Sequence, residues 1–267
     1  MSLKRAGYSV AGWNRSEKPI KYAMENKIID ERAIDFVDYD VVFVALPVDI
    51  TINFIDSTVF KDGSVVADIC GVKKYIEDAV YSKPRNFKYI GCHPMAGKEV
   101  SGIENASVDL FDNANMVITR SDKTDESAID LIKKLTKDLG FKYLVECSAV
   151  THDRKIAYTS QLAHIVSNAY VKSDELDGCL NFTGGSFQDM TRIAGVDEEV
   201  WADLYLKNAN NLTNNIENLT NELTKLKAAI SGADRQNLLK ILRDGRNRFG
   251  NSKNFVANKD IFVQKLK

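Results

Sequence analysis

Val41-Val42-Phe43-Val44-Ala45-Leu46 is apolar at every position, and it is the clearest indication of the fold in this chain. A short, continuous apolar run of this kind is typical of a parallel strand that is buried on both faces of a sheet. Pro47 follows at once and falls beyond the carboxyl end of the strand. The stretch therefore predicts a parallel strand in the interior of an α/β domain.

Similar short apolar runs lie on both sides of this strand and alternate with stretches of helical character. The other expected strands are Tyr8 to Trp13, Ser64 to Asp68, Phe87 to Gly91, Asn115 to Thr119 and Phe141 to Glu146. The expected helices are Pro19 to Asn26, Lys73 to Tyr81 and Thr124 to Leu139. This alternation is typical of an α/β fold with a doubly wound, Rossmann-like parallel sheet, in which ligands bind beyond the carboxyl ends of the strands.

The second half of the chain has an all-helical pattern. We expect a dinucleotide-binding domain over residues 1–149 and a helical domain for substrate binding and dimerisation over residues 150–267. Thr151 is a plausible N-cap for a helix that reaches Tyr170, and a longer helix is expected from about Glu198 to Ile230. Apolar residues recur in it about every 3.5 positions, as in a helix that packs along another. They are Tyr205, Leu212, Ile216, Leu219, Leu223, Leu226 and Ile230. This stripe belongs either to the core of one helical domain or to a homodimer, which we favour.

Composition excludes several classes of function. The net charge is −1, from 36 basic and 37 acidic residues. A chain this close to neutral shows no excess of positive charge for binding nucleic acid or an anionic membrane. No apolar stretch approaches the ~20 residues of a membrane span, so a cytoplasmic location is the default. The widely spaced cysteines and three histidines show no metal-ligand spacing, so we expect reduced thiols and no metal site.

Some residues of the cofactor site can be predicted from the sequence. The strand expected to end at Trp13 is followed by Asn14-Arg15-Ser16, where NAD enzymes usually carry a carboxylate for the ribose. The cation of Arg15 and the hydroxyl of Ser16 suit a 2′-phosphate, so we predict that the cofactor is NADP, with NAD possible. The other interpretation is that these three residues form an ordinary polar turn. Leu46 and Pro47 are expected to line the same site.

The glycine loop of a dinucleotide fold does not occur in this sequence. There is no G-x-G-x-x-G run, and the opening residues, Met1 to Tyr8, resemble the end of the first helix of such a fold. We therefore expect a sheet that lacks its first strand and glycine loop, both lying upstream of Met1 in an N-terminally truncated chain or a late gene model.

His93 is the first candidate for chemistry. It follows the apolar run Tyr89-Ile90-Gly91, so it is expected to emerge where a strand ends, and Pro94 favours an extended backbone at His93. An imidazole fixed at such a place is a candidate general base, because the pKa of histidine lies near neutrality. The alternative is a loop histidine braced by proline.

Two motifs carry a resemblance to a known family. His93-Pro94-Met95-Ala96-Gly97-x-Glu99-x-Ser101-Gly102 resembles the active-site loop of the prephenate and arogenate dehydrogenases of tyrosine biosynthesis. Gly184-Gly185-Ser186-Phe187-Gln188-Asp189-Met190-Thr191-Arg192-Ile193-Ala194 is similar to the family's substrate-arginine run. The resemblance extends from about residue 6 to about residue 230.

The resemblance implies NAD(P)-dependent oxidative decarboxylation of prephenate to 4-hydroxyphenylpyruvate. It makes His93 the catalytic base and Arg192 the arginine that binds the substrate carboxylate, unless Arg192 only pairs with Asp189. His164 aligns with a substrate-contacting histidine, although an isolated helical histidine is often a core residue. His152 also matches a family position, where a structural role at a helix start is expected.

One family position departs from the pattern. Asp68-Ile69-Cys70-Gly71-Val72-Lys73 corresponds to a family segment that often carries serine in place of Gly71. Because that serine helps to orient the substrate and the catalytic histidine, Cys70 or a water is expected to replace it beside Gly71.

Three alternatives stay open on the sequence. The chain could be a truncated, non-catalytic helical dimer of the same family, an arogenate dehydrogenase, or another dehydrogenase of the β-hydroxyacid type. Gly184-Gly185-Ser186 followed by Arg192 fits the last plan poorly.

Overall fold

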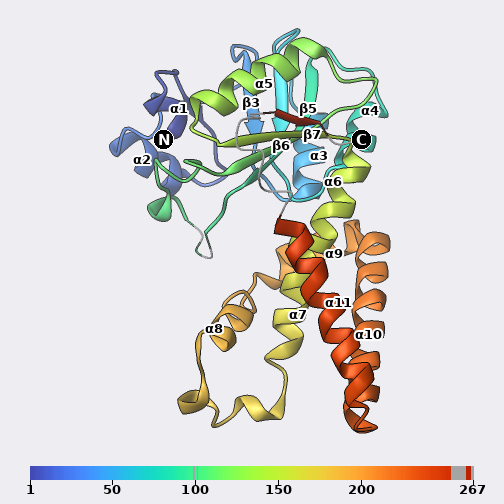
Figure 1. Cartoon of the computed structure of the whole chain (residues 1–267). Coiled ribbons are helices and arrows are strands. Elements are labelled where there is room, and N and C mark those ends of the chain that lie inside the picture. The colour runs from blue at the N-terminus through green and yellow to red at the C-terminus, as the bar shows by residue number, and fades with distance from the viewer. Residues whose placement is uncertain (99, 101, 254–262, 266–267) are drawn as a thin grey trace.

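The computed structural model describes residues 1–98, 100, 102–253 and 263–265, and consists of an α/β part joined to a helical part (Figure 1). The strands are β1 (Ala11–Gly12), β2 (Glu31–Arg32), β3 (Val41–Val44), β4 (Val65–Asp68), β5 (Lys88–Met95), β6 (Asn115–Thr119), β7 (Tyr143–Cys147) and β8 (Val263–Lys265). The helices of the α/β part are α1 (Ser2–Arg5), α2 (Glu17–Glu25), α3 (Val48–Ser57), α4 (Lys74–Tyr81) and α5 (Glu126–Asp138). The helices of the helical part are α6 (Ala149–Ile156), α7 (Leu162–Tyr170), α8 (Gly185–Thr191), α9 (Glu198–Lys207), α10 (Ala209–Ser231) and α11 (Arg235–Lys253).

The main sheet has the order β3-β4-β5-β6-β7-β8 in the described part of the chain. β3, β4 and β5 are parallel, as expected for the doubly wound fold, whereas β6 runs antiparallel to β5. A parallel neighbour needs a long crossover connection, usually a helix. The segment between β5 and β6 has only a 3₁₀ turn, Ile103–Asn105, among its described residues, so the chain returns beside β5 in the opposite direction.

β1 and β2 form a separate parallel pair, and the described strands show no pairing between β1 and β3. Aromatic side chains link this pair to the main sheet. Trp13 lies 5.7 Å from the Phe54 ring of α3, and Phe36 packs edge-on against the same ring. The carboxyl end of β1 is therefore held beside the amino-terminal half of the α/β part.

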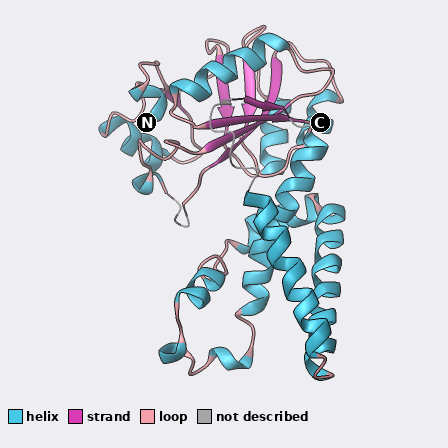
Figure 2. Cartoon of the chain, viewed as in Figure 1, coloured by secondary structure: helices cyan, strands magenta, loops and turns pink. Residues whose placement is uncertain are grey.

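Helices cover both faces of the main sheet (Figures 1 and 2). On one face, Ile129, Ile132 and Leu135 of α5 pack on alternate strand residues such as Ile90 and Ile118. On the other face, α3 and α4 pack on the opposite set. Those core residues are Val42, Val44, Val48, Ile55, Val66, Ile76, Val80 and Tyr89. Burial of both faces explains why apolar residues predominate in these strands.

β5 is longer than the sequence indicated. The strand was expected to end at Gly91, but it continues to Met95, with His93 opposite Val117 of β6. Pairing with β6 is a long-range contact that the local pattern does not encode. His93 is therefore held inside a strand rather than in a loop, which restricts its position more than the sequence suggested.

The helical part begins earlier than expected. Ser148, not Thr151, is the N-cap, because its side chain accepts from the backbone N–H of Thr151. α6 continues through a π-helical turn, Ala157–Gln161, directly into α7. A π turn inside an α-helix often marks a functional site.

The helix expected from Glu198 to Ile230 is broken at Asn208. Its buried side-chain amide donates to the Asp153 carbonyl oxygen at 2.9 Å and to Gln161 Oε1 at 2.8 Å. These two long-range bonds hold Asn208 with φ −123° and ψ 22°, which ends α9 and starts α10. The break turns α10 along the α6–α7 helix.

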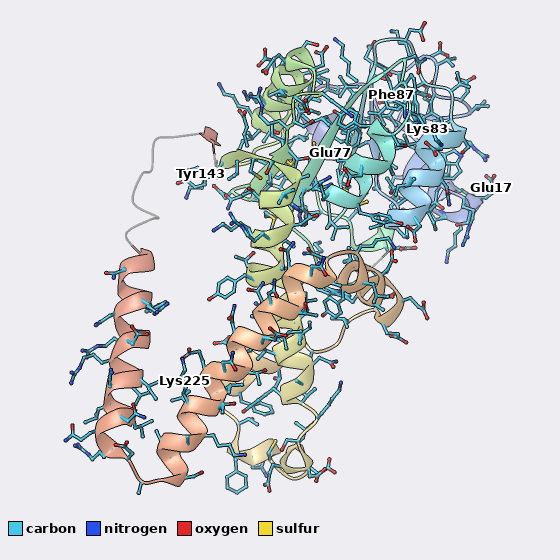
Figure 3. The ribbon with its side chains drawn as sticks, turned by 90° about the vertical axis from the view of Figure 1, so that its right-hand side faces the viewer. Glu17, Glu77, Lys83, Phe87, Tyr143 and Lys225 are labelled. Atoms are coloured by element: carbon cyan, nitrogen blue, oxygen red, sulfur yellow. The ribbon has the colours of Figure 1, made fainter. Side chains whose placement is uncertain are left out.

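α11 folds back from α10 after the turn near Gly232 and then diverges from it (Figure 3). Apolar residues on both helices face solvent: Leu223 is 55% exposed, Ile230 64% and Leu242 57%. The first part of the expected apolar stripe is covered within the chain, with Leu212 only 4% exposed. In its second part Leu223 and Ile230 are exposed, while Leu226 is half-buried.

Candidate active site

The centre of the candidate site is a chain of two histidines and a carboxylate. Nδ1 of His93, on β5, lies 2.8 Å from Nε2 of His152, near the start of α6. Nδ1 of His152 lies 2.7 Å from Oδ1 of Asp153. Because His93 belongs to the sheet and the other two residues to the helical part, this chain of hydrogen bonds crosses between the two parts.

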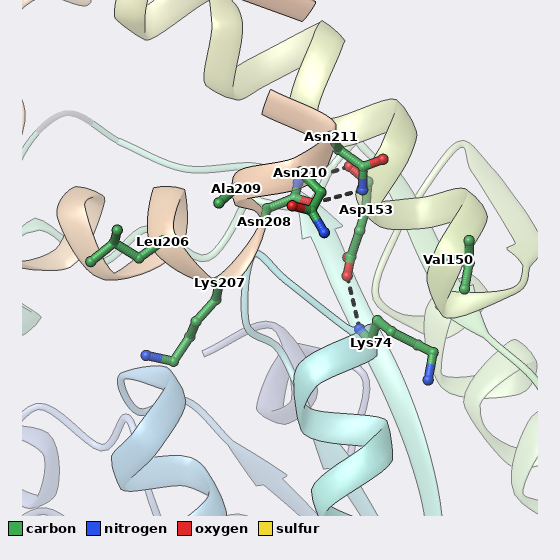
Figure 4. A pocket seen from close by; sticks show the side chains of 9 residues that line it. All are labelled: Lys74, Val150, Asp153, Leu206, Lys207, Asn208, Ala209, Asn210 and Asn211. Carbon is green, nitrogen blue, oxygen red and sulfur yellow. Dashed lines mark hydrogen bonds between the residues drawn. The ribbon is translucent and has the colours of Figure 1, made fainter. Parts of the chain in front are cut away.

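Asp153 is fixed from several directions. Its Oδ1 accepts from the backbone N–H of Lys73 at 2.8 Å and its Oδ2 from that of Lys74 at 2.9 Å, at the start of α4 (Figure 4). Its own carbonyl oxygen accepts from Asn208. His152 and Asp153 are 2% and 3% exposed. Burial of two polar side chains is tolerated here because both are hydrogen-bonded.

A buried ion pair lies beneath the histidines. The ammonium of Lys73 pairs with the carboxylate of Asp68, and both side chains have no exposed surface. Tyr89 donates its hydroxyl proton to Oδ2 of Asp68 at 2.6 Å, and the backbone N–H of Cys70 donates to Oδ1 at 2.9 Å. The pair fixes the carboxyl end of β4 next to His93.

Burial and nearby cations favour the neutral form of both histidines. Desolvation holds the pKa of His93 well below its usual range, with smaller contributions from His152 and the Lys73 cation. Desolvation also lowers the pKa of His152, although Asp153 opposes this shift. At neutral pH the His93 imidazole is therefore unprotonated at one nitrogen, as a general base requires.

Cys70 and Gly71 lie beside this centre. The Cys70 thiol donates to the Leu46 carbonyl oxygen at 3.3 Å and lies 3.4 Å from the Thr51 hydroxyl, and burial raises the pKa of the thiol to about 12. The thiol thus bonds to the turn between β3 and α3 rather than to His93. Gly71 faces the helical part, since a Cβ built there would lie 3.3 Å from the Leu204 side chain of α9.

His164 and Arg192 form a second group, on the helical part. Nδ1 of His164, on α7, lies 3.0 Å from the carbonyl oxygen of Ile193, the residue after Arg192, and its ring lies 3.9 Å from that of Trp201. Desolvation lowers the pKa of His164, and the nearby Arg192 cation lowers it further. The structure thus brings together the two residues expected to bind substrate.

The two groups are joined by one continuous helix. His152 and His164 are twelve positions apart on α6–α7, or about 18 Å along the axis at about 1.5 Å per residue. Glu99 and Ser101 of the His93 motif lie outside the part of the chain that the structure describes.

The expected cofactor residues lie at the carboxyl ends of β1 and β3. Asn14, Arg15 and Ser16 are exposed, and Asn14 Oδ1 accepts from the backbone N–H of Ser16 at 3.0 Å. Leu46 and Pro47 lead from β3 into α3. An exposed guanidinium beside a hydroxyl and an amide fits the ribose end of a dinucleotide, whereas the described residues include no glycine-rich loop for its pyrophosphate.

The sequence missed the contribution of His152 and Asp153 to the site. A structural role at a helix start was expected for His152, yet its ring contacts His93 directly. The local signal is a histidine followed by a carboxylate in the first turn of a helix. Its use depends on how α6 meets β5, which no local pattern gives.

No cluster of three or more metal-ligating side chains could hold a metal ion in the part of the chain described. Nor does any helix there have the length and apolarity needed to cross a membrane.

Comparison with known proteins identifies the family. Residues 1–145 match the family "Prephenate dehydrogenase, nucleotide-binding domain", and residues 148–244 match "Prephenate dehydrogenase, dimerization domain". The chain is 27% identical over 253 residues to the prephenate dehydrogenase of Bacillus subtilis, covering 90% of this chain and 68% of that protein. It is also 27% identical over 264 residues to the prephenate dehydrogenase of Lactococcus lactis, covering 92% and 71%.

Solved structures agree with this match. The chain resembles prephenate dehydrogenase from A. aeolicus in complex with hydroxyphenyl propionate and NAD+, with a TM-score of 0.81, 28% identity and coverage of 94% and 92%. Arogenate dehydrogenase from Synechocystis shares the fold, with a TM-score of 0.78, 23% identity and coverage of 94% of both chains. The two family matches together span most of the chain, which therefore belongs to the prephenate dehydrogenase family.

Proposed function

We propose that this protein catalyses the NAD(P)-dependent oxidative decarboxylation of prephenate to 4-hydroxyphenylpyruvate. The observation that carries the proposal is His93, an uncharged imidazole held on β5 where the sheet meets the helical part. The curated relatives in Bacillus subtilis and Lactococcus lactis carry the name of this activity, and an A. aeolicus relative was solved with NAD+.

The reaction needs a base, and His93 supplies it. A bound nicotinamide provides the acceptor for the hydride that leaves the ring carbon bearing the hydroxyl. The hydroxyl O–H bond breaks as the carbonyl forms, and its proton passes to His93. The bond from the ring to the carboxylate then breaks, CO2 leaves, and its electron pair enters the ring. The ring oxygen takes back the proton, which gives the aromatic product.

Substrate binding is assigned to the second group of residues. Arg192 presents a planar guanidinium that can bind a carboxylate through two hydrogen bonds, which lysine cannot do. His164, which packs against the Trp201 ring at a tilt of 39° and lies near Arg192, forms one wall of this site. Cys70 and Gly71 form the opposite wall, on the sheet side. In this arrangement the substrate lies between residues 1–149, which bind the nucleotide, and residues 150–267.

The cofactor assigned to the site is a nicotinamide dinucleotide, with NADP preferred over NAD. Arg15 is exposed beside Asn14 and Ser16, and no carboxylate occupies these three positions. A guanidinium there attracts a 2′-phosphate, whereas NAD enzymes usually place a carboxylate near the 2′-hydroxyl. Leu46 and Pro47 line the path toward the nicotinamide.

A homodimer through the helical part completes the proposal. Leu223, Ile230 and Leu242 expose apolar surface on α10 and α11, and a second copy would remove this surface from water. Light scattering should give twice the chain mass, and Leu223→Asp with Ile230→Asp should shift the mass toward the monomer. A monomeric parent protein would contradict this assignment.

The four free cysteines agree with a reducing compartment such as the cytoplasm.

The test of the function is a turnover assay with two substrates and two cofactors. We expect absorbance at the reduced-nicotinamide band to rise with prephenate, together with 4-hydroxyphenylpyruvate detected by chromatography. Tyrosine formed from arogenate at a higher kcat/KM would assign the chain to arogenate instead. Binding of either substrate without turnover, in a folded dimer, would favour a non-catalytic member of the family.

A further inference from the structure

The hydrogen bonds around His93 determine which of its two nitrogens carries the proton. The direction of donation along the chain His93–His152–Asp153 is determined at Asp153, where two backbone N–H groups donate to the carboxylate. These donors stabilise its ionised form, which can only accept hydrogen bonds. Nδ1 of His152, 2.7 Å from that carboxylate, must therefore carry a proton and donate it.

The consequence passes through His152 to His93. A neutral imidazole with its proton on Nδ1 has a lone pair on Nε2. Since Nε2 of His152 is the acceptor, Nδ1 of His93, 2.8 Å away, is the donor. The lone pair of His93 is then on its Nε2, for which the described residues provide no hydrogen-bond partner. The opposite assignment would place a lone pair of His152 against the carboxylate at 2.7 Å.

We propose that His152 and Asp153 are positioning residues that fix the tautomer of His93, so that Nε2 of His93 is the atom that takes the hydroxyl proton. This inference rests on the proposed function only for the identity of that proton; the tautomer itself is a property of the free protein. When Nε2 is protonated, the charge on His93 is stabilised through His152 by the buried carboxylate of Asp153. No proton needs to leave His93 for this to occur.

The surrounding charges agree with this arrangement. His93 faces His152 and the Lys73 cation, and His152 faces Asp153, Lys73 and Asp68. Burial lowers the pKa of both histidines, so both rings are neutral at pH 7 and each carries a single N–H. A neutral pair is the condition under which the direction of donation is defined along the whole chain.

The same bonds link the base to the helical part. From α6, His152 contacts His93 on β5, and Asp153 accepts from the backbone N–H of Lys74 at the start of α4. Asn208, where α10 starts, donates to the carbonyl oxygen of Asp153 (Figure 4). The orientation of His93 is thus set by the part of the molecule that carries Arg192. Base and substrate site are aligned by one set of contacts.

The experiment reads the tautomer directly by ¹⁵N NMR of the full chain labelled at histidine. Only three histidines occur, so single substitutions assign every ring. We expect Nδ1 of His93 to carry the proton and Nε2 to show the signal of an unprotonated nitrogen. The proposal is overturned if the wild-type protein carries the proton of His93 on Nε2.

Asp153→Asn is the decisive variant. Both oxygens of Asp153 accept from backbone N–H groups at the start of α4, and Oδ1 also faces Nδ1 of His152. With the NH2 group of asparagine at the Oδ1 position, it donates to Nδ1 of His152, which reverses the whole chain. His93 should then carry its proton on Nε2, and kcat should fall by about 10²–10⁴-fold with KM little changed, as a wrong tautomer does in a serine-protease triad. A reversed tautomer with unchanged kcat in folded Asp153→Asn, checked by circular dichroism, contradicts the proposal.

Two substitutions at His152 separate positioning from packing. In His152→Gln the amide oxygen can still accept from Nδ1 of His93, so the tautomer and most of kcat should be kept. In His152→Leu the acceptor is lost, and the two tautomers of His93 should mix. Equal loss of kcat in both variants, with the tautomer unchanged, would assign His152 to packing alone. If the tautomers behave as stated but the wild-type protein does not oxidise prephenate, the proposed function fails and the positioning role stands.

Discussion

Lys73→Met removes one partner of the buried ion pair beneath the site and leaves Asp68 charged in the interior. Both side chains have no exposed surface, so water cannot replace the lost ammonium. Breaking a buried pair costs about 3–5 kcal/mol. Asp68 keeps two donors, the Tyr89 hydroxyl at 2.6 Å and the Cys70 N–H at 2.9 Å. We therefore expect the lower end, about 3 kcal/mol.

The assay is denaturant unfolding followed by circular dichroism. A matched control is Lys74→Met, one residue on, where the ion pair with Asp78 is exposed and worth about 0.5 kcal/mol or less. The double variant Asp68→Asn with Lys73→Met should recover part of the loss, because no unpaired charge remains. If Lys73→Met and Lys74→Met lose the same small amount of stability, the buried pair does not support the fold as described.

Three further predictions concern binding and pH. Arg192→Gln should weaken substrate binding by about 2–5 kcal/mol, since a carboxylate loses its charged partner; an unchanged KM with a lower melting temperature would make Arg192 structural. Arg15→Asp should reverse a preference for NADP+ over NAD+ in kcat/KM, and equal use of both by the parent would reduce Asn14-Arg15 to a polar turn. Folding lowers the pKa of His93 and of His152, so the unfolded chain binds protons before the folded chain does as the pH falls below about 6.5. The free energy of unfolding should therefore decrease in that range, and it should decrease less in His93→Asn. A flat unfolding free energy from pH 7 to pH 5 would contradict the lowered pKa values.

The sequence predicted the parts of the fold that depend on local pattern. The run from Val41 to Leu46 indicated a strand buried on both faces. In β3, Val42 and Val44 are buried on one face, whereas Val41 and Phe43 on the other face are half-buried. The helix α3, which follows Pro47, was missed, because its apolar residues continue those of the strand and no polar break separates them. The direction of β6 could not be predicted, since it depends on a connection with no crossover helix.

The same limit applies to the site. His93 and Arg192 were found through motifs, but the partner of His93 comes from a residue 59 positions away. The break at Asn208 has a similar origin, because its buried amide bonds to Asp153 and Gln161 across the helical part. The spacing of apolar residues predicted continuation there, whereas asparagine is a poor helix former and tertiary hydrogen bonds end the helix.

The proposed mechanism depends on His93 as the base that accepts the hydroxyl proton of prephenate. Its decisive test is the steady-state rate of His93→Asn with prephenate and the preferred nicotinamide nucleotide, measured beside the wild-type protein. We expect kcat to fall by about 10²–10⁴-fold with KM nearly unchanged, because the side chain acts on the proton in the transition state rather than in binding. Turnover by folded His93→Asn within a few-fold of wild type would remove His93 from the mechanism.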